Sequence, residues 1–173
     1  MLYPIGIQTF EHIRRDGYVY VDKTAQIYRL ATTGKYYFLS RPRRFGKSLL
    51  VSTMDAYFSG RRDLFEGLAL SELEKEWIQY PVLRIDLGGK AYDGLEVLSQ
   101  VLDSSLRIWE EEYGIQNKYT VPGIRFSQVI RAACEQTGRP VVILVDEYDK
   151  PIVDNLGNDA LAEVFRTQLQ GFY

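Results

Sequence analysis

The sequence has 173 residues, of which 46% are hydrophobic and 25% are charged. This composition excludes disordered and low-complexity proteins, because the apolar fraction is large enough to build a core. The 21 Lys and Arg residues face 23 Asp and Glu residues, and this net charge of −2 excludes a uniformly basic nucleic-acid coat. One Cys and one His exclude an internal disulfide and a Cys/His zinc site. No secretory signal or membrane-length apolar run is visible, so we expect a cytoplasmic protein without a membrane partner.

The first part of the chain predicts one strand between two helices. A short β-rich stretch at 18–21 precedes a helix over 23–32, for which Asp22 is the expected N-cap. The aromatic run 36–40 predicts a buried strand. After a loop, apolar residues at helical spacing predict a helix over 47–58.

The second part alternates strands and helices. Residues 82–87 predict a strand, followed by helices over 93–113 and 126–136. The unbroken apolar run 141–145 is typical of a parallel strand that helices cover on both faces. A final helix is expected over 159–170. This order predicts an α/β class with at least three parallel strands, the aromatic run of the first part included.

Gly46-Lys47-Ser48 lies where a phosphate-binding loop belongs, between a predicted strand and a predicted helix. Glycine lets the backbone approach an anion, and the start of a helix favours negative charge. The lysine ammonium would contact the β- and γ-phosphates, and the serine hydroxyl would bind Mg²⁺. The usual first glycine of the motif is Arg41 here, so Arg41-Pro42 would have to make the tight turn in another way. The alternative interpretation is a basic surface loop without a ligand.

Asp146-Glu147 follows the apolar run at 141–145. Ligands of open α/β sheets bind at the carboxyl ends of the strands, so Asp146 is a candidate Mg²⁺ ligand and Glu147 a candidate base for an attacking water. The alternative is a polar pair at a strand exit. Asp86 ends the middle strand, either as a cap of the next turn or near the nucleotide. Cys134 is expected to be a small core residue and His12 to be structural.

Four segments resemble the AAA-ATPase-like family of bacterial proteins, and they lie at 4–7, 20–24, 38–49 and 145–152. The loop Arg-Pro-Arg-Arg-Phe-Gly-Lys-Ser is similar to that family's own form of the phosphate loop. The resemblance implies an AAA-type P-loop ATPase domain, a three-layer αβα fold with a parallel central sheet. It also implies that a nuclease-like domain of the PD-(D/E)XK kind commonly follows.

The resemblance assigns ATP and Mg²⁺ as cofactors and gives each candidate residue a role. The resemblance implies that Lys47 and Glu147 are catalytic and that Ser48 and Asp146 bind Mg²⁺. The residues implied to contact the nucleotide are Arg43, Arg44, Phe45, Gly46, Lys47, Ser48 and Leu49. Implied partners are a second copy that supplies an arginine finger and nucleic acid bound through the absent C-terminal domain.

We divide the chain into an N-terminal segment, 1–34, and a partial ATPase domain, 35–173, with its loop at 41–48 and its acidic strand at 141–147. The chain is expected to be a fragment, truncated before the strand that would carry a sensor residue. Two alternatives to Mg²⁺-dependent ATP hydrolysis remain. One is a nucleotide-binding switch or adaptor without turnover, and the other is a DNA-associated module.

Overall fold

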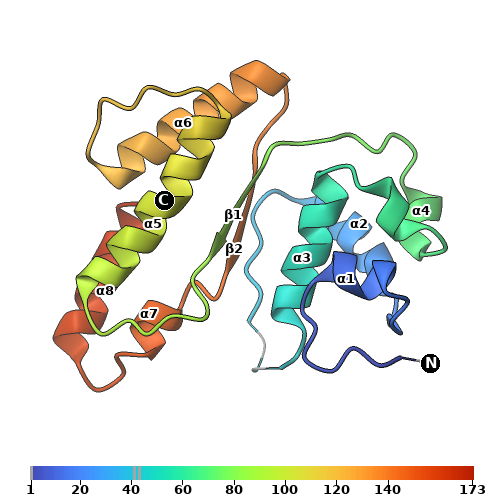
Figure 1. The fold of residues 1–173 in the computed structure, drawn as a ribbon, viewed down its shortest axis with the longest axis horizontal. Helices are drawn as coiled ribbons and strands as arrows, with labels where there is room; N and C mark the ends of the chain where they lie inside the picture. The colour runs from blue at the N-terminus through green and yellow to red at the C-terminus, as the bar shows by residue number, and fades with distance from the viewer. Residues whose placement is uncertain (1, 41, 43) are drawn as a thin grey trace. The chain divides into compact units, whose positions relative to one another are not determined.

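The computed structural model describes residues 2–40, 42 and 44–173. The chain forms two compact units, Met1–Tyr80 and Pro81–Tyr173, which are described separately below (Figure 1). The division after residue 34 that the sequence suggests stays a prediction. In the described part of the first unit the helices are α1 (Phe10–Arg15), α2 (Thr24–Thr33), α3 (Lys47–Phe58), the 3₁₀ turn η1 (Arg62–Phe65) and α4 (Ala69–Leu73). The second unit holds β1 (Val82–Asp86), α5 (Leu95–Glu112), α6 (Pro122–Thr137), β2 (Val142–Asp146), α7 (Lys150–Val153) and α8 (Asp159–Gln170).

An aromatic core holds the first unit together. The rings of Phe10 and Phe65 lie 4.8 Å apart, and Trp77 packs on Phe65 at 5.3 Å. Leu49 of α3 packs against this cluster, and the Phe10 backbone N–H donates to Ser52 Oγ at 3.0 Å. The core therefore fixes α3, the helix that begins at the phosphate-loop motif.

Asp22 joins two helix starts. Its Oδ1 accepts hydrogen bonds from the Thr24 backbone N–H at 2.8 Å and the Thr24 hydroxyl at 2.7 Å. Its Oδ2 accepts from the Ala69 backbone N–H at 2.7 Å, which ties α2 to α4. Burial acts to raise the pKa of Asp22, but the donors from Ala69 and Thr24 outweigh it and lower that pKa. The expectation that Asp22 is the N-cap is wrong, because α2 begins at Thr24 and its N-cap is Lys23; Asp22 instead binds the first residue of the helix from two positions before it.

The predicted buried strand at 36–40 is wrong. These residues form no strand, and Tyr36 is 95% and Phe38 70% exposed. The described part of the first unit holds no strand that could pair with the run, only an isolated bridge between Leu2 and Tyr18. The Tyr37 hydroxyl instead donates to the Leu30 carbonyl at 2.7 Å, near the end of α2.

The second unit contains the predicted parallel pairing. β1 and β2 pair in register from Val82↔Val142 to Asp86↔Asp146, so both strands end at the same edge. In Figure 1, α5, α6 and α8 lie together on one side of this pair. This arrangement confirms an α/β class, with two strands in the described residues where three were expected.

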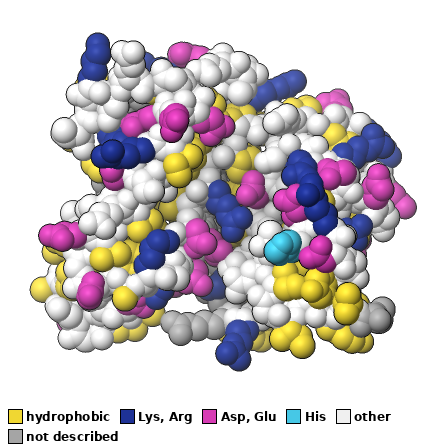
Figure 2. Space-filling view, viewed as in Figure 1, with side chains coloured by type: hydrophobic (Ala, Val, Ile, Leu, Met, Phe, Trp, Pro, Cys, Tyr) yellow, Lys and Arg dark blue, Asp and Glu magenta, His cyan; other side chains and the backbone are white. Residues whose placement is uncertain are grey.

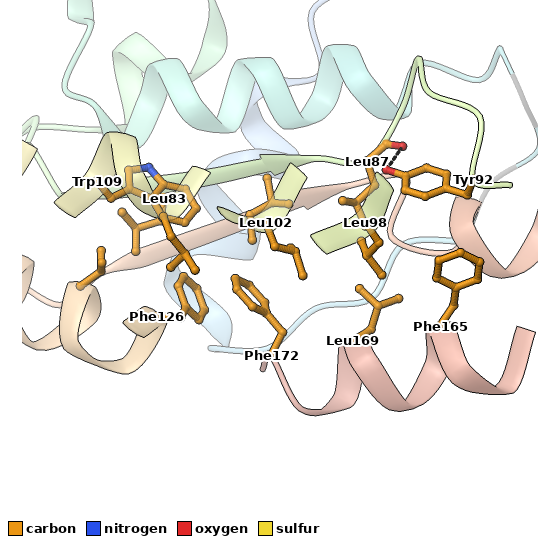
Figure 3. Packing of buried hydrophobic residues seen from close by; sticks show 13 residues of the cluster. Leu83, Leu87, Tyr92, Leu98, Leu102, Trp109, Phe126, Phe165, Leu169 and Phe172 are labelled. Carbon is orange, nitrogen blue, oxygen red and sulfur yellow. Dashed lines mark hydrogen bonds between the residues drawn. The ribbon is translucent and has the colours of Figure 1, made fainter. Parts of the chain in front are cut away.

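One face of the strand pair carries the core. Leu83 and Leu87 pack against leucines of α5 and the aromatic rings of the other helices, and Phe126 stacks on Phe172 at 4.6 Å (Figure 3). The prediction that β2 is buried throughout is wrong at Ile143, which is 40% exposed. Full burial would need a cover on the second face as well.

A buried ion pair links α5 and α6. Arg125 donates through Nε and Nη2 to the two carboxylate oxygens of Glu110, at 2.7 and 2.8 Å, and both residues are 7% exposed. A further donor, Arg125 Nη1, contacts Asp103 at 2.5 Å. The fork geometry of guanidinium matches a carboxylate, so the pair fixes the register between the two helices. Among the described residues, no helix has both the length and the apolar character needed to cross a membrane.

Candidate functional site

The phosphate-loop half of the candidate site is the start of α3. Helix α3 spans Lys47–Phe58, as the sequence predicts, and its N-cap Gly46 has a left-handed φ of 72°. No side chain among the described residues caps this helix start. The backbone N–H groups of a first helical turn lack partners within the helix, and such a terminus favours anions.

The turn before α3 uses left-handed residues. Arg44 has a φ of 67° and Gly46 one of 72°, so two positive-φ residues lie within three positions. The expectation that Arg41 takes part in the turn, and the nucleotide contact expected of Arg43, lie outside the described residues. Pro42 is exposed.

The candidate side chains of this half differ in exposure. Phe45 is 64% exposed, whereas Lys47 and Ser48 are partly buried. Among the described residues, no hydrogen bond or ion pair engages the side chain of Lys47 or Ser48. The Leu49 side chain packs into the aromatic core, which leaves only its backbone N–H for a ligand.

The acidic half of the candidate site lies at the end of β2. Asp146 is only 3% exposed, and its Oδ1 accepts the backbone N–H of Glu147 at 3.1 Å. Glu147 adopts a φ of 50°, in the left-handed region that disfavours residues with a Cβ. Its carbonyl accepts the backbone N–H of Lys150 at 2.9 Å. Hydrogen bonds on both sides therefore hold Glu147 in this conformation.

Asp86 brings a third carboxylate to this edge. It lies opposite Asp146 in the strand register, and its Oδ1 accepts the Gly88 backbone N–H at 2.8 Å. Asp86 thus caps the turn after β1, one of the two roles that the sequence leaves open. Gly88 lies close to the side chains of both Asp86 and Glu147. A Cβ added at Gly88 would lie 3.0 Å from Asp86 Oδ1 and 3.3 Å from Glu147 Oε2.

Two further residues hold the loop after β1. The Tyr92 hydroxyl donates to the Leu87 carbonyl at 2.9 Å, as Figure 3 shows. Burial, followed by the charges of Asp86, Asp154 and Glu147, raises the pKa of Tyr92 to about 12. Asn155 Nδ2 donates to the Tyr92 carbonyl at 2.6 Å, which anchors the loop to the segment after α7.

Sequence reasoning missed Gly88, Tyr92 and Asn155. The signal for Gly88 was available, because Gly88-Gly89 directly follows a strand at the edge where ligands bind in α/β sheets. Tyr92 and Asn155 gave no local signal. They are 63 residues apart and meet only in the folded unit.

The structure brings the predicted site residues together in two groups. Lys47 and Ser48 share the first turn of α3 in the first unit, and Asp146 and Glu147 share the end of β2 in the second. Within the described ranges, no group of three or more His, Cys, Asp or Glu side chains is arranged to hold a metal ion.

The remaining two expectations concern residues away from these groups. His12 is exposed, and it is the cyan side chain on the face drawn in Figure 2. The prediction that Cys134 belongs to the core is wrong, because Cys134 is exposed. Its neighbour Ala133 takes the buried position on α6, and one residue along a helix turns the side chain by about 100°.

Comparison with known proteins identifies the family. Residues 4–173 match a family described as "Predicted AAA-ATPase". A protein of Azotobacter chroococcum mcd 1, described as "Uncharacterized protein in vnfD 5'region", is 44% identical over 171 residues. The match covers 98% of this chain and 33% of that protein, so the chain spans about a third of this relative's length. No solved structure gives a significant match. The chain belongs to the AAA-ATPase-like family.

Proposed function

We propose that the chain binds ATP with Mg²⁺ through a P-loop of the AAA type, and that the full-length protein hydrolyses it. The observation that carries the proposal is Gly46-Lys47-Ser48 at the first turn of a helix, in a member of the AAA-ATPase-like family. An AAA-type ATPase needs both a phosphate cradle and an acidic strand end, and this chain has a candidate for each.

The phosphate cradle is assigned to the loop before α3 and to its first turn. The backbone N–H groups at 47–49 and the Lys47 ammonium bind the β- and γ-phosphates. Arg44 adds a guanidinium, which pairs well with phosphate oxygens, and Arg43 is given the same role from the sequence alone. Phe45 presents an exposed ring beside this cradle.

The acidic strand end supplies the remaining roles. The Asp146 carboxylate is an oxygen donor of the kind that Mg²⁺ accepts, and the Ser48 hydroxyl of the phosphate-loop half is proposed as a second Mg²⁺ ligand from its own motif. When bound, Mg²⁺ neutralises charge on the phosphates. The Glu147 carboxylate orients a water and accepts its proton. The half-buried position of Glu147 and its two backbone hydrogen bonds suit a base that must keep one geometry.

Titration calorimetry with ATP·Mg²⁺ tests the phosphate cradle. We expect saturable binding by the wild type and at least a tenfold loss for Lys47→Ala, because the loss of a charge-assisted contact typically costs more than 1.4 kcal/mol. Lys35→Ala is the matched control, since Lys35 is an exposed lysine of the same unit. Equal affinity for Lys47→Ala and wild type would exclude the cradle.

Phosphate release tests Glu147. We expect Glu147→Gln to bind ATP like the wild type and to lose roughly 100-fold or more in turnover, the range for a general base. Wild-type turnover by this variant would show that Glu147 is not the base. Tight binding without any phosphate release by the wild type would favour the switch or adaptor. DNA affinity with a steep salt dependence, and without competition from ATP, would favour the DNA-associated module.

A further inference from the structure

Gly88 lies between two carboxylates at the edge where β1 and β2 end. A Cβ at this position would lie 3.0 Å from Asp86 Oδ1 and 3.3 Å from both Cδ and Oε2 of Glu147. Its φ lies outside the left-handed range, so the strain that a side chain meets there does not apply at Gly88. The carboxylates of Asp86 and Glu147 are therefore what an added side chain would crowd here. Gly89 is the opposite case, with a φ of 69° and no atom within 4 Å of an added Cβ.

The backbone on either side of this contact is held in place. On the β1 side, Asp86 Oδ1 accepts the Gly88 N–H, and the buried Tyr92 hydroxyl holds the Leu87 carbonyl. On the β2 side, the Glu147 N–H and C=O are both hydrogen-bonded. A methyl group added at Gly88 would therefore press on both carboxylates, on Asp86 Oδ1 at 3.0 Å and on Glu147 Cδ and Oε2 at 3.3 Å, and would displace these side chains before the backbone.

We propose that Gly88 and Asp86 are positioning residues for the Glu147 carboxylate. Asp86 holds the turn that places Gly88 beside Glu147. Because Gly88 has no side chain, the Glu147 carboxylate can occupy the position from which it acts on water. The inference rests on the proposed role of Glu147 in ATP hydrolysis. It gives the loop after β1 a part in turnover, with no part in nucleotide binding.

The test is Gly88→Ala, with Gly94→Ala as its matched control. An added Cβ at Gly94 meets no atom within 4 Å, and its φ of −159° suits any residue. In the full-length protein we expect Gly88→Ala to lower kcat for ATP·Mg²⁺ roughly threefold to tenfold, since a 1 Å misplacement can cost about 100-fold and the shift here is a few tenths of an ångström. The KM and the dissociation constant of ATP·Mg²⁺ should stay at wild-type values, as should all constants of Gly94→Ala.

The Asp86 variants separate positioning from folding. Asp86→Asn keeps an oxygen that can accept the Gly88 N–H and should keep kcat within about twofold, whereas Asp86→Ala should lower it as Gly88→Ala does. Equal losses in both Asp86 variants would remove Asp86 from the proposal.

The outcomes distinguish this inference from the proposed function. A wild-type kcat for Gly88→Ala, in a protein that Glu147→Gln inactivates, would overturn the positioning role alone. A parallel rise in KM and in the dissociation constant would overturn it in favour of a binding role. No turnover by the wild type, or full turnover by Glu147→Gln, would remove the proposed hydrolysis and this inference together.

Discussion

The left-handed backbone at Glu147 makes a testable prediction about stability. Glu147 has a φ of 50°, where a Cβ crowds the backbone and costs roughly 1–2 kcal/mol. Glycine has no Cβ, but it loses about 0.4–1 kcal/mol more than alanine in the entropy of the unfolded chain. Glu147→Gly should therefore be more stable than Glu147→Ala by about 1 kcal/mol. Both variants remove the same carboxylate, so the interactions of that group cancel in the comparison.

Glu66 provides the reference position. It is an exposed glutamate with an ordinary φ of −54°, outside any helix. At this position the difference in stability between the two variants comes only from the entropy of the unfolded chain. Glu66→Ala should therefore be more stable than Glu66→Gly by about 0.4–1 kcal/mol. The order of the glycine and alanine variants should thus reverse between the two positions.

Urea and thermal unfolding of the four variants measure this reversal. A difference of 1 kcal/mol corresponds to about 2–4 °C in Tm for a chain of this size. Glu147→Gly and Glu147→Ala should both lose ATP turnover if the proposed function is right. If Glu147→Ala proves as stable as Glu147→Gly or more so, the backbone at this position is not strained and the reasoning fails.

Three further predictions concern the scaffold. Gly123→Ala should lower the free energy of unfolding, measured in urea, by about 1–3 kcal/mol, because the added Cβ would lie 2.3 Å from the Gly171 carbonyl oxygen. Alanine favours helices, so an increase in stability would show that this contact does not exist. Arg125→Leu should cost about 3 kcal/mol or more because it leaves Glu110 buried without its partner, and adding Glu110→Leu should recover most of that loss; no recovery would refute the explanation. Hydrogen bonds lower the folded-state pKa of Asp22, so its contribution is fully present above the ordinary value of 3.8 and is lost as pH falls through the folded-state pKa. Asp22→Asn should thus lower the free energy of unfolding by about 1 kcal/mol at pH 7, and a difference that persists undiminished at pH 2 would be evidence against it.

Local sequence was sufficient where an element is defined by its own periodicity. The helix over 47–58 has the bounds that the apolar spacing predicts, and the runs at 82–87 and 141–145 form the parallel pair β1 and β2. Apolar spacing marks one face of a helix, and an unbroken β-branched run favours a strand, without knowledge of the partner.

Local sequence was insufficient where a neighbour decides the outcome. The run at 36–40 is as apolar as a strand, but a strand also needs a second backbone to pair with, which no local pattern encodes. The same limit applies to Cys134, because an apolar stretch of helix does not show which of two adjacent residues faces the core. In the candidate site, the motif residues were predictable from type and order. The contact of Gly88 with Glu147 depends on the register between β1 and β2.

The residue at position 147 is the reverse of what the backbone there favours, and the residue at position 88 is set by its neighbours. At Glu147 the backbone is left-handed, and glycine would relieve the strain there. At Gly88 the φ is not in the left-handed range, but an added Cβ would lie 3.0 Å from Asp86 Oδ1 and 3.3 Å from Glu147 Oε2. Glu147 therefore costs stability where it stands, and Gly88 leaves space beside its carboxylate. Strain that the surrounding hydrogen bonds maintain is characteristic of functional sites. A carboxylate with its own space at the end of a strand is what a base that orients water requires. The backbone strain at Glu147 and the space that Gly88 leaves beside its carboxylate thus support the proposal that Glu147 is the base.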